Sequence, residues 1–248
     1  MSRPRRVLFI AYYFPPSGGS GVQRPLKFVK YLERFGWEPV VLTVKESAAF
    51  PARDPALAAD IPPSTEIHRT PIWEPHTIFQ RLTGSRRGGA VDVDTVARWD
   101  RLSFPARCLS RIRATLFVPD ARIGWFPFAV SRARAIHRRR PVDAVLSTGP
   151  PFTAHLIGRS VARRIGRPWV ADYRDPWTHA AFYPPRPGWV RRLDRRLEGR
   201  CLARADRNIV VVPAMRDEFL ADHPRLAPHR FAVIPNGYDP DDFPDPPP

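Results

Sequence analysis

The chain has 248 residues, of which 43% are hydrophobic, and a formal net charge of +16. This length allows one large domain or two small ones, and this hydrophobic fraction is typical of a protein that buries a core. No apolar run approaches the ~20 residues that span a bilayer, and no signal-peptide pattern follows the basic start MSRPRR, so we expect a cytoplasmic protein.

The positive charge is almost entirely arginine, because Lys27, Lys30 and Lys45 are the only lysines. We expect anionic partners, either phosphates or an anionic membrane surface at the inner face of the cell membrane. We expect no nucleic acid, because the sequence holds no recognition motif for it. Cys108, Cys201 and the seven histidines show no metal-ligand spacing, so we predict reduced, buried thiols and no metal.

Short apolar runs alternate along the chain with amphipathic stretches. Strands are predicted at 5–14, 38–44, 64–70, 142–148, 168–173, 207–212 and 231–235. Helices are predicted at 21–35, 123–136, 151–166 and 213–222, with a further helix whose apolar stripe is Trp189, Leu193, Leu197 and Cys201. This alternation predicts an α/β fold, a Rossmann-like parallel sheet flanked by helices.

Two segments do not fit the alternation. Residues 72–120 are predicted to form an irregular insertion within a domain that covers 1–238. Residues 239–248 are acidic and rich in proline, with neither helical nor strand periodicity, and are predicted to form a linker.

Four stretches directly follow predicted strands, where ligands bind in such a sheet. The sequence SGGSG brings three glycines to a helix N-terminus, where backbone N–H groups favour anions. The dinucleotide fingerprint G-x-G-x-x-G is not met, because Arg24 stands where the third glycine belongs. The candidate residues of the four stretches are Gly18, Gly19 and Gly21; Thr148 and Gly149; Asp172, Arg174 and Asp175; and Asn236.

Each stretch also has a purely structural interpretation. The glycines fit a tight turn, and the prolines of STGPPFT fit the first turn of a helix. The arginine and aspartates of DYRDPW fit an internal ion pair that fixes a loop, and Asn-Gly in IPNGYD is a turn signal. The four stretches together are more specific than any one of them.

Taken in order and spacing, these motifs resemble the amino-terminal domain of family 4 glycosyltransferases. The resemblance rests on FPPSGGSGVQRPLKFVKYLERFGWEPVVLT, VLSTGPPFTAHL, WVADYRDPW, ADRNIVVVPAMRDEFL and FAVIPNGYDPDDF. It covers residues 5–243, is weak across 45–120, and is closest to bacterial cell-surface polysaccharide enzymes whose strand ends carry a proline pair and Arg-Asp-x-Trp.

The resemblance implies one half of a GT-B fold, in which the amino-terminal half mainly binds the acceptor. It implies a retaining transfer of a sugar from a nucleotide-sugar donor to a saccharide acceptor, expected to be lipid-linked, with no cofactor. Gly18, Gly19 and Gly21 would then face the donor phosphates, and Gln23 and Arg24 would face the acceptor or a donor phosphate. We expect the glycine N–H groups and Arg174 to stabilise charge on the leaving diphosphate. Asp175 would orient Arg174 or contact the acceptor.

The sequence departs from the family pattern in two ways. Many relatives carry a histidine where Thr148 and Gly149 stand, and His155, a turn or more further on, is not expected to replace it. The donor-side motif Glu-x7-Glu does not occur with its surrounding strand, loop and helix, so we expect the donor domain to be absent and the 248-residue chain to be inactive alone. Three alternatives remain: a nucleotide-sugar epimerase on the same scaffold, a non-catalytic sugar- or phosphate-binding module, and half of a split enzyme.

Overall fold

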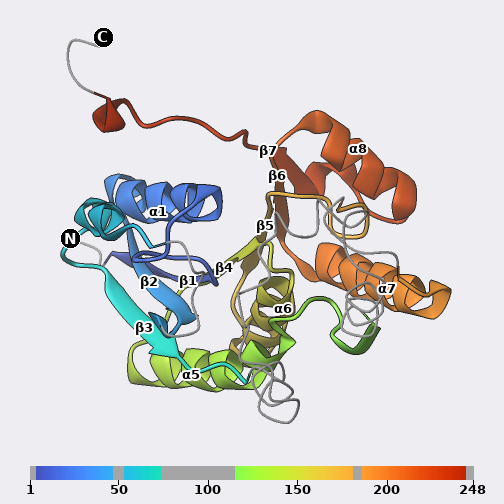
Figure 1. Cartoon of the computed structure of the whole chain (residues 1–248), viewed down its shortest axis with the longest axis horizontal. Helices are drawn as coiled ribbons and strands as arrows, with labels where there is room; N and C mark the ends of the chain where they lie inside the picture. The colour runs from blue at the N-terminus through green and yellow to red at the C-terminus, as the bar shows by residue number, and fades with distance from the viewer. Residues whose placement is uncertain (1–3, 47–52, 74–114, 181–185, 244–248) are drawn as a thin grey trace, which may run out of the picture.

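The computed structural model describes residues 4–46, 53–73, 115–180 and 186–243 (Figure 1). Seven parallel strands form one sheet in the order β3-β2-β1-β4-β5-β6-β7, which confirms the predicted α/β fold. The strands are β1 (Arg5–Ala11), β2 (Trp37–Val44), β3 (Glu66–Thr70), β4 (Ala144–Gly149), β5 (Trp169–Tyr173), β6 (Arg207–Val210) and β7 (Phe231–Val233). The helices are α1 (Ser20–Leu32), α5 (Phe126–Arg139), α6 (Thr153–Ile165), α7 (Gly188–Arg204) and α8 (Pro213–Asp222).

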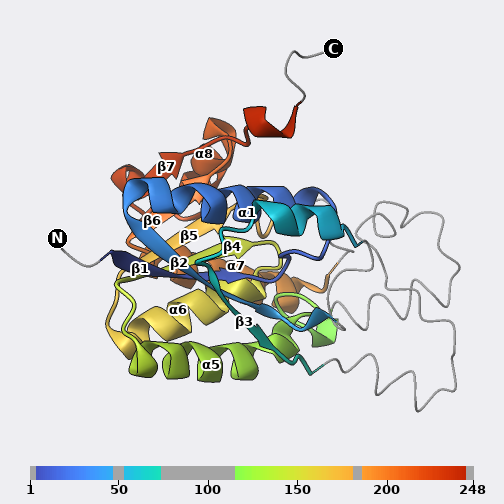
Figure 2. The same cartoon turned by 90° about the vertical axis from the view of Figure 1, so that its left-hand side faces the viewer.

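Helices cover both faces of the sheet (Figure 2). Side chains alternate along β1, so that Phe9 and Ala11 pack with α1 in the smaller core. Leu8 and Ile10 point to the opposite face and join the larger core under α5 to α8. A strand buried on both faces explains why β1 reads as a continuous apolar run.

Left-handed glycines end two of the helical segments. Gly36 (φ 74°) follows the 3₁₀ helix η1 (Glu33–Phe35), which extends α1. Gly166 (φ 64°) ends α6. Both glycines adopt the positive φ that L side chains rarely tolerate.

The stripe predicted for α7 is half right, because Cys201 is buried and Leu197 packs against the core, whereas its first two residues are not buried. Trp189 is 56% exposed and Leu193 is 37% exposed. The buried face carries two acids instead. The Trp177 indole donates to Asp194 (3.3 Å), and Glu198 accepts from the backbone N–H of Thr178 (2.9 Å). Two buried carboxylates on α7 therefore hold the loop that follows β5, a role that hydrophobic periodicity does not register.

The two segments without predicted periodicity are described only in part. Most of 72–120 lies outside the described residues, and so do 244–248. Residues 55–60 form an unpredicted 3₁₀ helix, η3 (Pro55–Asp60). Within the predicted linker, Pro240–Asp242 form the 3₁₀ helix η7, and this turn packs against α1.

At the amino ends of the strands, a charged network surrounds Arg6, which is 1% exposed. Its guanidinium donates to Glu38 (3.1 Å), to Glu66 (2.6 Å) and to the backbone oxygen of Arg140 (2.6 Å). The backbone N–H of Arg6 donates to Asp143 (2.8 Å). Arg6 therefore ties β1 to β2, to β3 and to the turn that precedes β4.

Cys201 is buried and free, as predicted, whereas Cys108 lies outside the described residues. Burial raises the pKa of the Cys201 thiol to about 12. Because the thiolate is the reactive form, we expect iodoacetamide at pH 8 to leave Cys201 unlabelled in the folded protein and to label it fully in denaturant. Peptide mass spectrometry checks this, and rapid labelling of the folded protein would contradict the burial.

None of the helices in the described part of the chain is both long and apolar enough to cross a bilayer.

Candidate functional site

The candidate site lies at the carboxyl ends of β1, β4 and β5. The chain moves outward from β1 through β2 and β3, then returns to β4 and moves outward in the other direction. The strand order therefore reverses between β1 and β4, where the loops that follow these strands diverge. Ligands of open α/β sheets bind at such a point.

The glycine loop after β1 leaves the N-terminus of α1 without a side-chain cap. Gly19 is the N-cap residue, with a φ of 90° that favours glycine, and it is exposed. No described side chain caps this helix, and its first turn holds no acid. Gly18, by contrast, is buried, and a Cβ there would lie 3.1 Å from the Cβ of Asp54. The loop therefore offers uncapped N–H groups at Gly19 and the first turn, while Gly18 serves packing.

Arg174 joins the loops that follow β1, β4 and β5. Its backbone N–H and its Nε donate to the Gly149 oxygen, at 3.0 and 3.3 Å. Its two terminal nitrogens donate to the backbone oxygens of Gly21 and Pro150. A Cβ on Gly21 would lie 3.4 Å from one of these nitrogens, so glycine at 21 leaves room for the guanidinium. The predicted proximity of Arg174 to the glycine loop is thus present.

The loop after β4 differs from the glycine loop, because the N-terminus of α6 has a partner. The Asp120 carboxylate accepts from the backbone N–H (2.9 Å) and the hydroxyl (2.8 Å) of Thr153, the first residue of α6. An acid supplied by the protein therefore already occupies the position that an external anion would take at this helix. Of these two helix N-termini, that of α1 is the one open to a ligand.

His155 lies behind this loop and is fully buried. Its Nδ1 lies 2.9 Å from the Ser147 hydroxyl, which also accepts from the Trp169 indole (2.9 Å). A Cβ on Gly149 would lie 2.7 Å from the His155 Nε2, so the ring packs directly against that glycine. Burial lowers the pKa of His155 to about 3, which keeps the ring neutral. His155 is therefore a fully buried, neutral ring that packs against Gly149 at the end of β4.

Thr148, Asp172, Arg24 and Asn236 form a second group. Asp172 is fully buried, and it accepts from the Thr148 hydroxyl (2.7 Å) and from Arg24 (2.8 Å). Arg24 also reaches the Asn236 side-chain oxygen (3.3 Å). The structure therefore brings together four predicted residues from α1, β4, β5 and the segment after β7, and they bind one another.

Gln23 and Asp175 complete the predicted set. Gln23 is exposed on α1, and no hydrogen bond of its side chain is described. Asp175 is half-buried beside Arg174. Burial raises the pKa of Asp175 above its ordinary value, although the Arg174 charge opposes this. Asp175 is thus a half-buried carboxylate without a described hydrogen bond.

The raised pKa of Asp175 predicts a stability cost at neutral pH. A carboxyl group whose pKa is raised by folding holds its proton more tightly in the folded state, so stability falls as pH rises through that pKa. We therefore expect Asp175→Asn to be more stable than the parent at pH 7, with the difference vanishing near pH 3. Urea unfolding between pH 3 and 7 checks this, with the exposed Asp217→Asn as control. A variant less stable than the parent at pH 7 would show that Arg174 outweighs burial.

Sequence reasoning missed three residues near this edge. Burial raises the pKa of Tyr13, and the charges of Arg122 and Arg174 oppose that rise, as a hydrogen bond from Arg122 does. The Arg122 guanidinium also lies 5.1 Å from the centre of the Tyr12 ring. Asp120 and Arg122 stand at the end of the irregular insertion, where no periodic pattern marks them. The one available signal was Tyr13 itself, which lies near the end of the predicted strand 5–14, two residues beyond Ala11.

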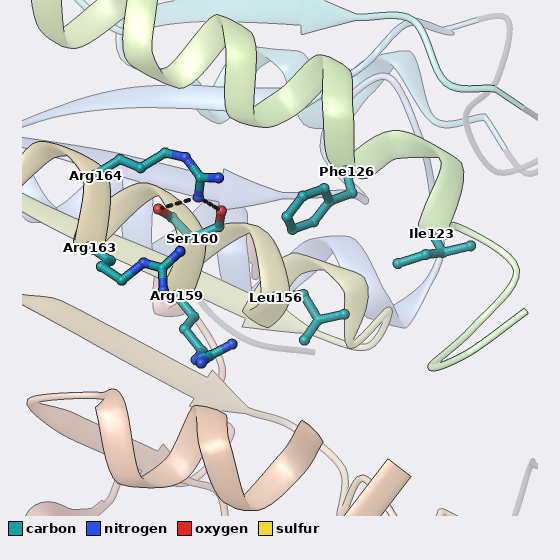
Figure 3. Close-up of a pocket in the computed structure, with 7 residues that line it drawn as sticks. All are labelled: Ile123, Phe126, Leu156, Arg159, Ser160, Arg163 and Arg164. Atoms are coloured by element: carbon teal, nitrogen blue, oxygen red, sulfur yellow. Dashed lines mark hydrogen bonds between the residues drawn. The ribbon is translucent and has the colours of Figure 1, made fainter. Parts of the chain in front are cut away.

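A surface groove of about 340 Å³ lies between α5 and α6 (Figure 3). Ile123, Phe126 and Leu156 line one end of it. Ser160 and three arginines of α6 line the other. Neither helix contains an acidic residue, and the arginines they carry are Arg132, Arg134, Arg138, Arg139, Arg159, Arg163 and Arg164.

Comparison with known proteins agrees with the fold and with the motifs. Residues 81–242 match the family model Glycosyltransferase Family 4, and this match covers more than half of the chain. The chain therefore belongs to glycosyltransferase family 4. No curated protein sequence matches it.

Solved structures show which fold the chain has. It is similar to a sucrose-phosphate synthase from Thermosynechococcus elongatus at 13% identity and a TM-score of 0.55, over 96% of this chain and 50% of that one. A second structure of that synthase is similar at 13% identity and a TM-score of 0.51, over 94% of this chain and 90% of that one. The chain thus has the Rossmann-like fold of one half of a GT-B glycosyltransferase, and it spans half the length of the first synthase structure.

A UDP-N-acetylglucosamine 2-epimerase is also similar, at 13% identity and a TM-score of 0.45, over 95% of this chain and 52% of that one. A likeness this low carries no argument for epimerisation.

Proposed function

We propose that this chain is the acceptor-binding half of a retaining glycosyltransferase that moves a sugar from a nucleotide-sugar to a lipid-linked saccharide in cell-surface polysaccharide synthesis. The observation that carries the proposal is the uncapped N-terminus of α1 beside Arg174, at the point where the strand order reverses. The nucleotide-sugar is held mainly by a second Rossmann-like half.

The proposed chemistry is electrostatic. Sugar transfer passes through an oxocarbenium-like state while negative charge grows on the departing diphosphate. The N–H groups at Gly19 and in the first turn of α1 face that charge, and the Arg174 guanidinium adds a positive charge beside them. Because Arg174 is fixed by three backbone oxygens, it needs no reorganisation during the reaction. No metal and no protein nucleophile enters this scheme, and Asp175 contacts the acceptor or orients Arg174.

The function is tested by expressing the chain with and without the polypeptide encoded directly downstream of codon 248. With radiolabelled nucleotide-sugars and bacterial lipid extract as acceptor, we expect no transfer by the chain alone and transfer by the combination. Transfer by the 248 residues alone would contradict the half-enzyme proposal. Epimerised nucleotide-sugar in place of transfer would establish the epimerase alternative, and no turnover by either preparation would favour a binding module.

An anionic membrane surface at the inner face of the cell membrane is the partner we propose for the groove between α5 and α6. The three arginines there have no described ion pair, and the apolar end fits the boundary between head groups and acyl chains (Figure 3). We expect co-sedimentation with vesicles that contain phosphatidylglycerol, a loss with rising salt, and a loss in the variant Arg159→Ser with Arg163→Ser. Arg216→Ser, on α8, is the control, and equal sedimentation of both variants would remove this partner.

A further inference from the structure

The segment after β7 does not leave the domain freely. From Ile234 it runs back over α1, and η7 ends it there (Figure 1). The backbone N–H of Ile234 still donates to the Val210 oxygen (2.9 Å), as a last bond beyond the sheet. The remaining contacts of this segment come from side chains of α1 and η3.

Arg24 provides the first of these contacts, and all of its N–H groups are engaged. Its Nε and one terminal nitrogen donate to Asp172, at 3.1 and 2.8 Å. The same terminal nitrogen reaches the Ile234 oxygen (3.0 Å). The other donates to the Pro235 oxygen (3.0 Å) and to the Asn236 side chain (3.3 Å). The Arg24 side chain is only 8% exposed, so its guanidinium has no donor left for a ligand in this arrangement.

Lys27, Lys30 and Tyr31 provide the second contact, around Asp239. The Asp239 side chain is 1% exposed and lies 2.8 Å from the ammonium groups of both lysines. The Tyr31 hydroxyl donates to the same carboxylate (2.5 Å). Burial alone would raise the pKa of Asp239, but these hydrogen bonds hold it below its ordinary value. The carboxylate therefore stays charged and bound at neutral pH.

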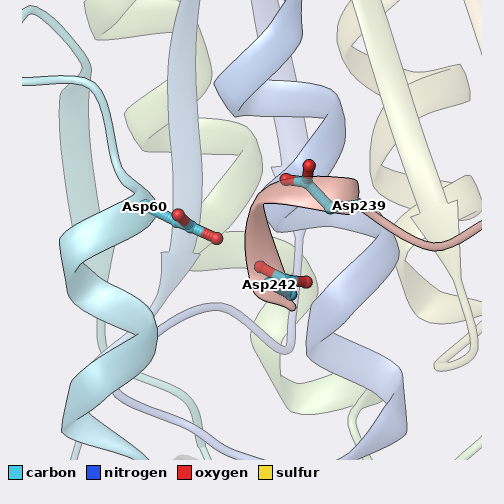
Figure 4. Close-up of side chains that lie close together, drawn as sticks. All are labelled: Asp60, Asp239 and Asp242. Carbon is cyan, nitrogen blue, oxygen red and sulfur yellow. The ribbon is translucent and has the colours of Figure 1, made fainter. Parts of the chain in front are cut away.

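Asp60 of η3 and Asp242 of η7 converge with Asp239 on the same spot (Figure 4). Three carboxylates at this distance could suit a cation, but the Lys27 ammonium group already lies among them. It contacts Asp60 and lies 2.8 Å from Asp239 and 2.5 Å from Asp242. The cluster is therefore an ion-pair junction between α1, η3 and the segment after β7.

We propose that Arg24, Lys27 and Lys30 form a clasp that holds residues 234–242 on the domain. The spacing of three residues places these side chains along one side of α1. Because Arg24 also holds Asp172 at the end of β5, the clasp links this segment to the candidate site. Its consequence rests on the proposed function: the clasp sets the position of the donor half. The three side chains are positioning residues, which replaces the predicted contact of Arg24 with a phosphate.

The clasp is tested by hydrogen exchange on the whole chain. The backbone N–H groups of Asp242 and Phe243 are bonded within η7, at 3.0 and 3.1 Å, and report on its docking. We expect Asp239→Asn, and Lys27→Met with Lys30→Met, to speed exchange in this turn about tenfold, while the amides of β1 and β4 keep the parent rates. Lys45→Met, which replaces the remaining lysine, is the matched control and leaves η7 unchanged.

Conservative variants separate the clasp from a general loss of stability. Lys27→Arg keeps the charge and retains slow exchange in η7. Arg24→Lys does not, because a single ammonium group cannot replace the donors that Arg24 uses. If a variant also speeds exchange in β1 and β4, the parent chain is compared at 0.05 and 1 M NaCl instead. We then expect the higher salt to speed exchange in η7 alone.

Unchanged exchange in η7 in all variants, and in the parent at high salt, would overturn the clasp. Failure of the proposed function has a different signature, namely absent diphosphate binding with η7 still protected.

Discussion

Replacing Arg6 with methionine is expected to lower the free energy of unfolding by about 3 kcal/mol, because the change removes a buried guanidinium that binds two carboxylates and a backbone oxygen at once. Arg6 is almost fully buried and donates to Glu38, Glu66 and the Arg140 backbone. The lost contacts join β1 to β2, to β3 and to the turn that precedes β4. Urea unfolding at pH 7, followed by tryptophan fluorescence, measures the change.

Arg140→Met is the matched control. The Arg140 side chain binds the same carboxylate, Glu38, through two bonds of 2.6 Å, but it is 55% exposed. An exposed pair contributes about 0–1 kcal/mol, so we expect a loss below about 1 kcal/mol. Similar losses for both variants would show that burial does not govern the Arg6 network. An Arg6→Met variant as stable as the parent would show that the carboxylates rehydrate freely.

Replacing Arg174 with methionine is expected to weaken UDP binding at least about tenfold, because the guanidinium supplies the fixed positive charge next to the glycine loop. The same change leaves the oxygens of Pro150 and Gly21 without this donor, while Gly149 keeps its bond from the backbone N–H of residue 174, so we expect a loss of about 2 kcal/mol in stability as well. Arg174→Lys restores little of either, because one ammonium group cannot reach all three oxygens. Titration followed by NMR gives the affinity, and urea unfolding gives the stability.

Arg230→Met controls for the loss of an arginine that binds backbone oxygens. Arg230 donates to the Ala203 and Ala205 oxygens at 2.9 and 3.2 Å, near the end of α7. We expect the Arg230→Met variant to be somewhat less stable than the parent and to bind UDP with the parent affinity. If Arg174→Met binds UDP as tightly as the parent does, Arg174 serves only to hold the loops together. The DYRDPW stretch then has the purely structural role described in the sequence analysis.

Much of the fold could be predicted, because buried parallel strands and amphipathic helices leave local patterns. The seven strands and the glycine loop before α1 all appear in the sequence. The buried face of α7 could be placed only in part, because Asp194 and Glu198 are buried by contacts with a loop and not by hydrophobicity. Periodicity assigns such acids to the exposed face.

The partners within the site could not be predicted for a similar reason. Arg24 and Asp172 are 148 positions apart, and Arg24 and Pro235 are 211 apart. A sequence shows that a strand end is polar, but it does not show whether its charges face a ligand or each other. The cap of α6 by Asp120 illustrates this, because both loops after β1 and β4 are predicted ligand positions, but one helix N-terminus is open and the other is satisfied.

The most direct measurement follows the backbone amides of Gly19, Ser20 and Gly21 and the Nε of Arg174 by ¹⁵N NMR during titration with UDP. We expect saturable chemical-shift changes at these four positions. They should require millimolar UDP, because this chain supplies one side of the proposed binding site, and they should be much smaller with uridine, which lacks the diphosphate. Shifts confined to the arginines between α5 and α6, or no difference between UDP and uridine, would contradict the account.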